Sequence, residues 1–265
     1  GIRPEGNAKQ DPHGDFKGKN ILFMAHSVEE TAERFSRPKK DIEQALEKSR
    51  LKLLQARAER SRPHLDDKIL TSWNGLMIAG LADAGRLLEE EKYTDAAMDA
   101  AEFVLENLRK DDGRLLRSFA AGEAKLNAYI DDYAFLTAGL FSLHRATGDD
   151  KWLTIGKELT DKQLSLFWDD VHGGFYFTSS DHPALIVRVK DPVDSALPSG
   201  VSVSAENLLY LAAQTDDANY LEKLQLTLRS SAPMFEKSPA AVPRLAAVLA
   251  EYLDGSPETP DDSPN

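Results

Sequence analysis

The sequence contains no cysteine. Disulfide bonds, thiolate metal sites and cysteine-based redox catalysis by this chain are therefore excluded. Long apolar runs are also lacking, because none approaches the roughly 18 residues that a membrane-spanning helix needs. The first residues have no apolar signal region, so we expect a cytoplasmic protein that does not act on a membrane.

The sequence has fewer basic than acidic residues. The chain has 44 acidic and 32 basic residues, which gives a formal net charge of -12. Nucleic acids and anionic membranes are bound by clustered Lys and Arg, so neither is an expected partner. The negative net charge does not exclude a small anionic substrate, because one local pocket with Arg or Lys can bind one carboxylate.

Several common catalytic motifs are missing as well. There is no Gly-rich phosphate loop and no G-x-S-x-G sequence around a nucleophilic serine. The histidines show no H-x-x-x-H spacing of the kind that binds metals; they are His13, His26, His64, His144, His172 and His182. We therefore expect no metal and no other cofactor. His144 lies near the end of a predicted helix, where a dipole role is expected.

The sequence is rich in helical periodicity. From Trp73 to Leu88, apolar and small residues recur at steps of three and four, the period of a buried helical face. They are Trp73, Leu76, Met77, Gly80, Leu81, Ala84, Leu87 and Leu88. A second helix is predicted at about 92–109, and the short connection requires the two helices to pack as an antiparallel hairpin. An earlier helix is predicted between Pro38 and Arg62.

This hairpin is repeated along the chain. The motif Ala79-Gly80-Leu81 recurs as Ala138-Gly139-Leu140, at an offset of 59 residues, and a weaker third copy follows at an offset of 68. Such a period indicates stacked units that bury their apolar faces against one another. We predict an all-α domain of helical hairpins over 36–254, an irregular segment over 1–35 and a disordered tail over 255–265. Aromatic and β-branched runs also predict a small β-hairpin near 173–190.

Polar residues gather where the first helices of the hairpins begin. Ser72, Asp131 and Ser199 are equivalent positions in the repeat, and each is suited to cap a helix. Because these helices run parallel, their N-termini should lie at one end of the domain. Unpaired N–H groups and the positive end of the helix dipole make such an end a good place for oxygen-rich ligands or carboxylates.

The polar residues at these ends have structural and functional interpretations, and the sequence does not choose between them. Asp131 and Asp132 could simply cap a helix, the charged run 62–68 could be a solvated loop, and His64 could be structural. If Asp66, Asp67 or Asp132 faced each other across a cleft, they would form an acid/base pair of the kind that glycosidases use. His64 could also act as a general base or orient a ligand.

Several motifs together resemble one known family. The run RPHLDDKILTSWNGLMIA at 62–79 resembles the signature of the YyaL family, which includes the spermatogenesis-associated thioredoxin-domain proteins. The motifs at 131–136, 173–175 and 190–200 resemble that family in the same order, and the resemblance runs from about residue 1 to residue 253.

This resemblance implies an (α/α) toroid of the six-hairpin glycosidase class, distantly related to N-acylglucosamine 2-epimerases. Family members carry a thioredoxin-like domain and further helices before this region, so both are expected partners that this chain lacks. The chain has fewer helices than a closed six-hairpin toroid, which leaves closure open. Epimerases of the related class use paired histidines as acid and base, and no such pair can be assigned in this sequence.

The leading hypothesis is a carbohydrate-active or carbohydrate-binding domain in which Asp residues perform acid/base chemistry on a sugar. The candidate catalytic residues are Asp66, Asp67, Asp132 and His64. The candidate substrate-binding residues are Arg62, Lys68, Trp73, Asn74, Tyr129, Asp131, Tyr133, Phe175, Lys190, Asp194 and Ser199. Among these, Arg62 or Lys68 would hold a substrate carboxylate or hydroxyl group, and Trp73 or Phe175 would stack on a sugar ring. The alternative is a non-catalytic interaction domain that serves a thioredoxin-like domain. The substrate and the oligomeric state are not determined by the sequence.

Overall fold

The computed structural model describes residues 2–8, 12–183, 186–215 and 217–255. The chain divides into two compact units, Gly1–Leu65 and Asp66–Asn265. Within the described ranges, no helix is both long and apolar enough to cross a membrane. The tail that we predict to be disordered lies outside the described residues, except for Gly255.

The first unit contains two helices, α1 (Val28–Phe35) and α2 (Lys39–Ala58). Helix α2 begins directly after Pro38, close to the predicted start. Helix α1 occupies the end of the segment that the sequence led us to describe as irregular. Its start is stabilised by a capping box, in which the Ser27 side chain accepts from the Glu30 N–H and the Glu30 carboxylate accepts from the Ser27 N–H. This Ser-x-x-Glu spacing is a recognisable sequence signal for a helix start.

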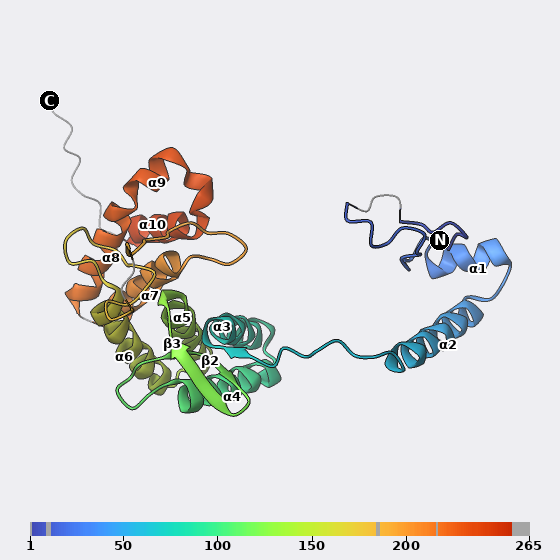
Figure 1. The fold of residues 1–265 in the computed structure, drawn as a ribbon, viewed down its shortest axis with the longest axis horizontal. Helices are drawn as coiled ribbons and strands as arrows, with labels where there is room; N and C mark the ends of the chain where they lie inside the picture. The colour runs from blue at the N-terminus through green and yellow to red at the C-terminus, as the bar shows by residue number, and fades with distance from the viewer. Residues whose placement is uncertain (1, 9–11, 184–185, 216, 256–265) are drawn as a thin grey trace. The chain divides into compact units, whose positions relative to one another are not determined.

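The second unit is built from helical hairpins, as the repeat predicts. Helices α3, α5, α7 and α10 form an inner row, and α4, α6 and α8 lie along its outer side (Figure 1). The hairpins and the last helices have these bounds: α3 (Thr71–Leu88) with α4 (Glu91–Leu108), α5 (Ile130–Thr147) with α6 (Asp150–Phe167), α7 (Gly200–Gln214) with α8 (Ala218–Ser230), then α9 (Ala232–Lys237), the 3-10 helix η1 (Pro239–Ala241) and α10 (Pro243–Gly255).

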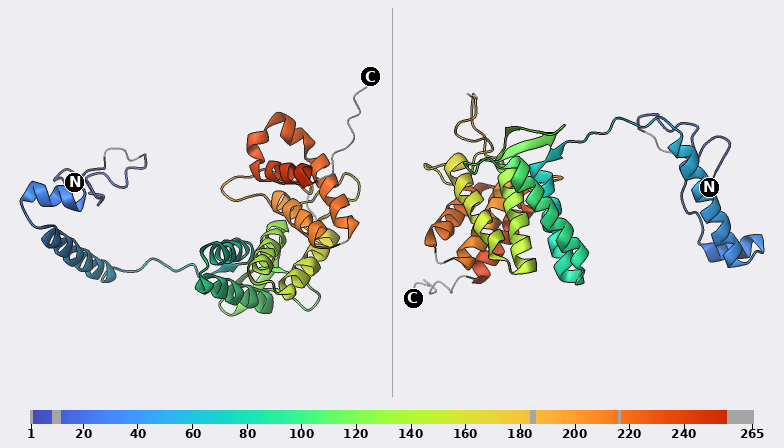
Figure 2. Two further views of the ribbon diagram at one scale, coloured as in Figure 1. Left: turned by 180° about the vertical axis from the view of Figure 1, so that it is seen from behind. Right: turned by 90° about the horizontal axis from the view of Figure 1, so that it is seen from below.

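A small antiparallel sheet lies at one end of these helices (Figure 2). It consists of β1 (Ile69–Leu70), β2 (Leu116–Ala120) and β3 (Glu123–Asn127), in the order β1-β2-β3. The turn between β2 and β3 has positive φ angles at Ala121 and Gly122, as two-residue hairpin turns often do.

The prediction of a β-hairpin near 173–190 is wrong for residues 173–183 and 186–190, which are the part of that segment that the structure describes. It has no strand, and its ladder-like contacts are the bridge between Trp168 and Phe175 and a hydrogen bond from the Phe177 N–H to the Val189 carbonyl. Gly173 and Gly174 both have positive φ angles, which turn the chain back rather than extend it. The β-branched Ile186 and Val187 are exposed instead of paired.

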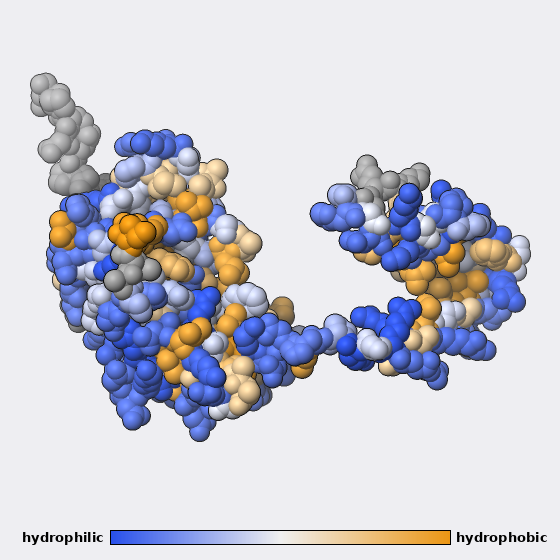
Figure 3. Space-filling model, in the orientation of Figure 1, coloured by the Kyte–Doolittle hydropathy of each residue, from blue (hydrophilic) through white to orange (hydrophobic). Residues whose placement is uncertain are grey.

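The core lies between the inner and outer helices and is continuous through the second unit. Its largest fully buried side chains include Ile78, Leu108, Tyr133, Leu136, Phe141, Trp152 and Tyr220. The predicted buried face of α3 is partly wrong, because Trp73, Met77, Leu87 and Leu88 are exposed. The face that packs inward is instead formed by Gly75, Ile78, Ala82 and Gly85. Figure 3 shows apolar patches among the hydrophilic residues on one side of the surface.

Small residues are buried on α3 because it packs very closely against α5. A Cβ atom added to Gly75 would lie 2.4 Å from the backbone N of Leu136, and one added to Gly139 would lie 2.8 Å from the Gly75 carbonyl oxygen. These distances are far below normal contact distances, so only glycine allows the two helix backbones to approach in this way.

We predict that Gly75→Ala lowers the free energy of unfolding by about 2 kcal/mol or more, because a methyl group would force α3 and α5 apart. Helix propensity alone would instead raise the free energy of unfolding, by up to about 1 kcal/mol, because alanine favours a helix more than glycine does. Gly80→Ala is the matched control, because nothing lies within 4 Å of an added Cβ at Gly80 in the same helix. Urea unfolding of both variants measures the difference. Equal stabilisation of the two proteins would contradict the close packing.

Candidate functional site

The carboxylate of Asp132 joins the beginnings of two neighbouring inner helices. Its Oδ1 accepts from the Ser72 N–H of α3 at 3.0 Å, and its Oδ2 accepts from the Tyr129 N–H of α5 at 2.9 Å. The side chain is completely buried, and the nearest guanidinium nitrogen of Arg117 is 3.8 Å away. Burial raises the pKa of Asp132, while these N–H donors and Arg117 oppose the shift.

Asp194 makes the same kind of junction at the other end of the inner row. Its Oδ1 accepts from the Ser199 N–H at the start of α7 at 2.8 Å, and its Oδ2 accepts from the Arg244 N–H of α10 at 2.9 Å. In both junctions one carboxylate satisfies the N-cap N–H of one helix and a first-turn N–H of its neighbour. The inner helices therefore begin at one end of the domain, as the repeat predicts.

The predicted caps are only partly confirmed. Ser199 is the N-cap of α7, and its side chain accepts from the Ser202 N–H. The N-cap positions of α3 and α5 are instead Leu70 and Tyr129. The capping carboxylate of α5 comes from Asp132, one residue after the predicted position, because a side chain in the first turn can reach back to the N-cap N–H.

Asp131 joins α5 to α7 but is only partly buried. Its carboxylate accepts a hydrogen bond from the Gly200 N–H at the start of α7. Burial raises the pKa of Asp131 to about 6, and the neighbouring Asp132 carboxylate adds to the shift. Asp191 also raises it, whereas the Gly200 N–H and Arg117 lower it. The pKa of Asp131 therefore lies closer to neutral pH than that of an Asp side chain in water.

Aromatic side chains gather around Tyr129, whose ring is in contact with Arg117, one of the charged groups that act on Asp131. The rings of Tyr129 and Phe177 stack with centroids 5.1 Å apart and an interplanar angle of 18°. The Arg117 guanidinium lies 4.8 Å from the Tyr129 ring centre, and the His182 ring lies 5.9 Å from it. Tyr129 is half-buried. Of these four residues, the sequence identified only Tyr129 as a candidate. Arg117 comes from strand β2, and Phe177 and His182 come from the loop after α6. No local pattern indicates that these two segments meet at Tyr129.

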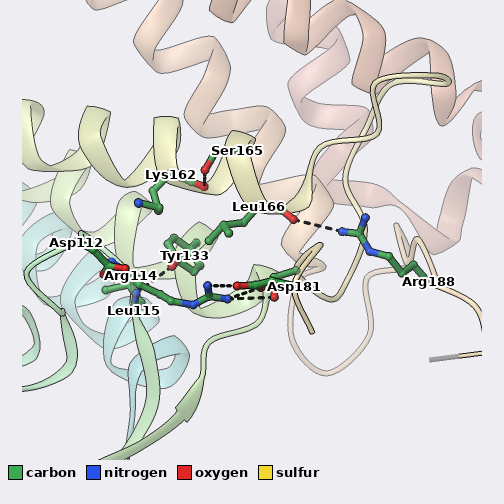
Figure 4. A network of polar contacts seen from close by, with 10 residues as sticks. Asp112, Arg114, Leu115, Tyr133, Lys162, Ser165, Leu166, Asp181 and Arg188 are labelled. Carbon is green, nitrogen blue, oxygen red and sulfur yellow. Dashed lines mark hydrogen bonds and ion pairs between the residues drawn. The ribbon is translucent and has the colours of Figure 1, made fainter. Parts of the chain in front are cut away.

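Two polar networks hold the long loop after α6 in place. Arg114 forms an ion pair with both carboxylate oxygens of Asp181 and donates to the Ser179 hydroxyl, which fastens the loop to the start of β2 (Figure 4). Asp169 forms an ion pair with Lys190 at 2.7 Å and accepts from the Tyr176 hydroxyl. Burial opposes ionisation of Asp169, but these donors together hold its pKa well below the usual range.

Several other candidate residues have structural contacts that account for them. Phe175 is fully buried and packs edge-on against Trp168. The Tyr133 hydroxyl accepts from the Leu115 N–H, and burial raises the Tyr133 pKa to about 12. The Asn74 amide donates to the Leu70 carbonyl one turn earlier. Lys190 is engaged by Asp169, as described above.

The charged run that begins at Arg62 is exposed along its whole length. Arg62 and His64 fall in the first unit, and Asp66, Asp67 and Lys68 fall in the second. Lys68 pairs locally with Asp66 at 3.1 Å. This exposure is what the solvated-loop interpretation expects. Trp73, at the start of α3, is 62% exposed and is available for contact with a ligand or partner.

Arg117 and Asp191 are additions to the candidate site that the sequence did not identify. Asp191 was visible only as part of the motif around Lys190, and Arg117 only as a charged residue in an unassigned segment. Within the described part of the chain, no group of three or more His, Asp or Glu side chains is placed to hold a metal ion.

The chain is similar to known proteins over nearly all of its length. Spermatogenesis-associated protein 20 of Homo sapiens is 34% identical over 262 residues, which cover 94% of this chain and 33% of that protein. The protein of the same name from Mus musculus is 35% identical over 254 residues, which cover 92% of this chain and 32% of that protein. The chain therefore spans about one third of the length of these relatives. No family model matches it.

Solved structures show which fold the chain has. Cellobiose 2-epimerase from Bacillus thermoamylovorans B4167 matches with a TM-score of 0.52 and 12% identity, over 65% of this chain and 46% of that chain. Unsaturated glucuronyl hydrolase from Bacillus sp. GL1 matches with a TM-score of 0.51 and 17% identity, over 65% of this chain and 49% of that chain. The second unit thus has the (α/α)-toroid fold of glycosidases and epimerases, and the predicted fold class is confirmed.

We predict that removing the junction carboxylates loosens the inner row. Asp132→Ala should lower the free energy of unfolding by about 2–4 kcal/mol, because it leaves the buried Ser72 N–H and the partly buried Tyr129 N–H without acceptors. Asp194→Ala should lower it by a smaller amount, about 1–2 kcal/mol, because that site is only half-buried. Asp170→Ala, at an exposed position after α6, is the control and should change it by no more than about 0.5 kcal/mol.

Chemical denaturation followed by circular dichroism gives all three values. If Asp132→Ala were as stable as Asp170→Ala, the junction would not hold α3 and α5 together.

Proposed function

The chain is a homologue of about one third of spermatogenesis-associated protein 20, as the resemblance at 62–79 indicated, and we propose that it forms a carbohydrate-active or carbohydrate-binding domain. Two facts motivate the sugar ligand. The solved structures that share its fold include a cellobiose 2-epimerase and an unsaturated glucuronyl hydrolase. Ionisable and aromatic side chains also meet at the end of the domain where the inner helices begin.

The observation that carries this proposal is the position of Asp131 at the start of α5, where its carboxyl group contacts the first N–H of α7 and stays partly exposed. The raised pKa of Asp131 supports the same assignment. A carboxyl group with a pKa of about 6 is protonated often enough near neutral pH to donate a proton, and its conjugate base can take the proton back. We assign it the role of general acid/base toward a sugar oxygen. Asp191, whose charge acts on Asp131, is the proposed second carboxylate.

We assign this role to Asp131 rather than to Asp132 because of their hydrogen bonds. Both oxygens of Asp132 are occupied by backbone N–H donors, and the side chain has no exposed surface. Asp131 has an exposed portion and one backbone donor. Asp132 would then act on the chemistry indirectly, by raising the pKa of its neighbour.

The remaining candidates have binding roles in this proposal. Arg117 would donate hydrogen bonds to sugar oxygens, and the stacked pair of Tyr129 and Phe177 offers an aromatic surface next to Arg117. Exposed Trp73 is a further stacking candidate. Asp66 and Asp67, which the sequence suggested as catalytic residues, are proposed here as substrate contacts together with Lys68, because all three are exposed and belong to the second unit. Arg62 and His64 belong to the first unit and are not assigned to this site.

We predict that Asp131→Asn abolishes turnover of glycosides or unsaturated uronides while preserving the hydrogen bond from Gly200, since an amide oxygen also accepts. In the wild type, turnover should fall as pH rises above about 6, where Asp131 loses its proton. Asp170→Asn is the control for an exposed carboxylate. Turnover by Asp131→Asn equal to that of the wild type would remove Asp131 from the chemistry.

The same variant has a second readout in stability. The folded pKa of Asp131, about 6, lies above the unfolded value of about 3.9. Its protonated form therefore stabilises the fold fully below about pH 4, and this contribution is lost as pH rises to about 6. Melting curves between these pH values should show a decline for the wild type that is smaller in Asp131→Asn.

The exposed face of α3 supports a second candidate function, as an interaction domain. Trp73, Met77, Leu87 and Leu88 are 60–68% exposed. At 3.6 residues per turn, their positions lie on one face of the helix, within about 100° of one another. This exposed α3 stripe is the kind of surface that another helix covers. Since the chain spans about one third of its relatives, we propose that a helix from the remainder of the longer protein packs here.

We predict that Trp73→Gln combined with Met77→Gln leaves the melting temperature of this chain unchanged within about 2 °C, because both side chains are already in contact with water. In the longer protein the same pair should lower it by several degrees, because each buried side chain contributes about 1.5–3 kcal/mol. Calorimetry on both proteins tests this. An unchanged melting temperature in the longer protein would show that the stripe stays uncovered.

A further inference from the structure

A cavity of about 710 Å³ lies in the second unit between α7, α8 and α10, and Arg145 of α5 lies at its edge. This volume is in the range of small-molecule sites. Arg145 is 14 residues after Asp131 on the same helix, which places the two about 21 Å apart along α5 at 1.5 Å per residue. The cavity is therefore separate from the sugar site proposed above, and nothing in that proposal uses it.

The walls of the cavity are largely apolar. Leu209, Ala212 and Ala213 of α7 line one side, and Leu221 of α8 lines another. The two alanines are short, so they leave room that longer side chains would fill. Apolar walls of this kind favour a ligand with an apolar body, because its burial removes apolar surface from water.

The polar edge of the cavity carries a guanidinium group with unused hydrogen-bond donors. Arg145 donates to the Ser142 hydroxyl at 2.8 Å and lies 5.1 Å from the ring centre of Tyr210. No ion pair of Arg145 is found among the described residues. Asp83 and Glu206 line a smaller pocket together with Arg145, but they pair with Arg86 and Arg244. A guanidinium has five N–H donors, so most of them remain available to a carboxylate ligand.

One of the two neighbouring carboxylates is already paired. The Glu206 carboxylate also lines the cavity, but Arg244 binds it at 2.6 Å and 2.8 Å. The Tyr210 hydroxyl is hydrogen-bonded to His144 Nδ1 at 2.7 Å, which holds the ring under Arg145. Glu251 lines the cavity from α10 and is exposed. Arg145 is itself exposed, and its contacts with Ser142 and Tyr210 place the guanidinium at the rim of the cavity, beside the apolar wall.

We propose that this cavity binds a small organic carboxylate with an apolar body, whose carboxylate group pairs with Arg145. The apolar part lies against Leu209, Ala213 and Leu221. Attraction to the C-terminal dipole of α5 and to the Tyr210 ring would also favour an arginine at this position without any ligand. Binding measurements separate these two roles.

Isothermal titration of the whole chain with hexanoate, hexan-1-ol and hexylammonium tests the proposal, because the three probes share an apolar chain and differ in charge. Hexanoate should bind most tightly. Arg145→Met should weaken hexanoate binding by about tenfold or more, through loss of a charge-assisted contact. Arg145→Lys should bind with intermediate affinity. Arg109→Met, which removes an arginine that pairs with Glu158 outside the cavity, is the control and should bind as the wild type does.

Two further variants distinguish a binding site from a structural contact. Glu251→Gln should tighten hexanoate binding, because it removes a negative charge from the rim, and it should leave hexan-1-ol binding unchanged. Ala213→Phe should weaken the binding of hexanoate and hexan-1-ol alike, because it fills the apolar part; position 213 is exposed, so the fold should persist. Circular dichroism of each variant confirms folding.

The proposal is overturned if the wild type binds none of the probes, or if Arg145→Met binds hexanoate as tightly as the wild type. Asp131→Asn should bind hexanoate normally. Its failure to alter sugar turnover would therefore count against the sugar site alone, and leave the carboxylate cavity unaffected.

Discussion

The buried carboxylate of Asp132 is the contact on which the rest of the second unit depends. One side chain satisfies backbone N–H groups of both α3 and α5, and Asp194 does the same for α7 and α10. Helix beginnings leave N–H groups without partners, and burying them unpaired is unfavourable. Sharing a carboxylate between neighbours solves this problem and also aligns the inner helices at one end. The sheet and the long loops are then attached to that same end.

The adjacent residues Asp131 and Asp132 have different environments in the structure. Consecutive positions on an α-helix point about 100° apart, because a turn takes 3.6 residues. Asp132 therefore points toward α3, while Asp131 points toward α7, where Gly200 approaches closely and part of the carboxyl group stays exposed. Burial is the main cause of the raised pKa of Asp131, and the charge of Asp132 adds to it. The contact that holds α3 and α5 together therefore lies next to the carboxyl group to which we assign a role in acid/base chemistry.

The sequence predicts some parts of this fold well and others poorly. The helical hairpins follow from periodicity, and the 59-residue repeat places α3 and α5 in register, since both depend on local spacing. The buried face of α3 was harder to identify. Large apolar residues at Trp73 and Met77 suggested the core, but the close approach of α5 selects Gly75 and Ile78 instead. The strand content near 173–190 was overestimated, because two glycines with positive φ turn the chain before it can extend.

The sequence by itself determined the helical repeat, the absence of thiol chemistry and the end of the domain where polar residues gather. These properties depend on composition and on spacing along one chain. Only the tertiary structure decided which of the two adjacent aspartates is buried and fully hydrogen-bonded. It also decided that Tyr129 meets both Arg117 and Phe177, and that Arg145, which forms no ion pair among the described residues, lies at the edge of a largely apolar cavity. Each of these depends on contacts between segments that are far apart in the chain, and no local pattern records them.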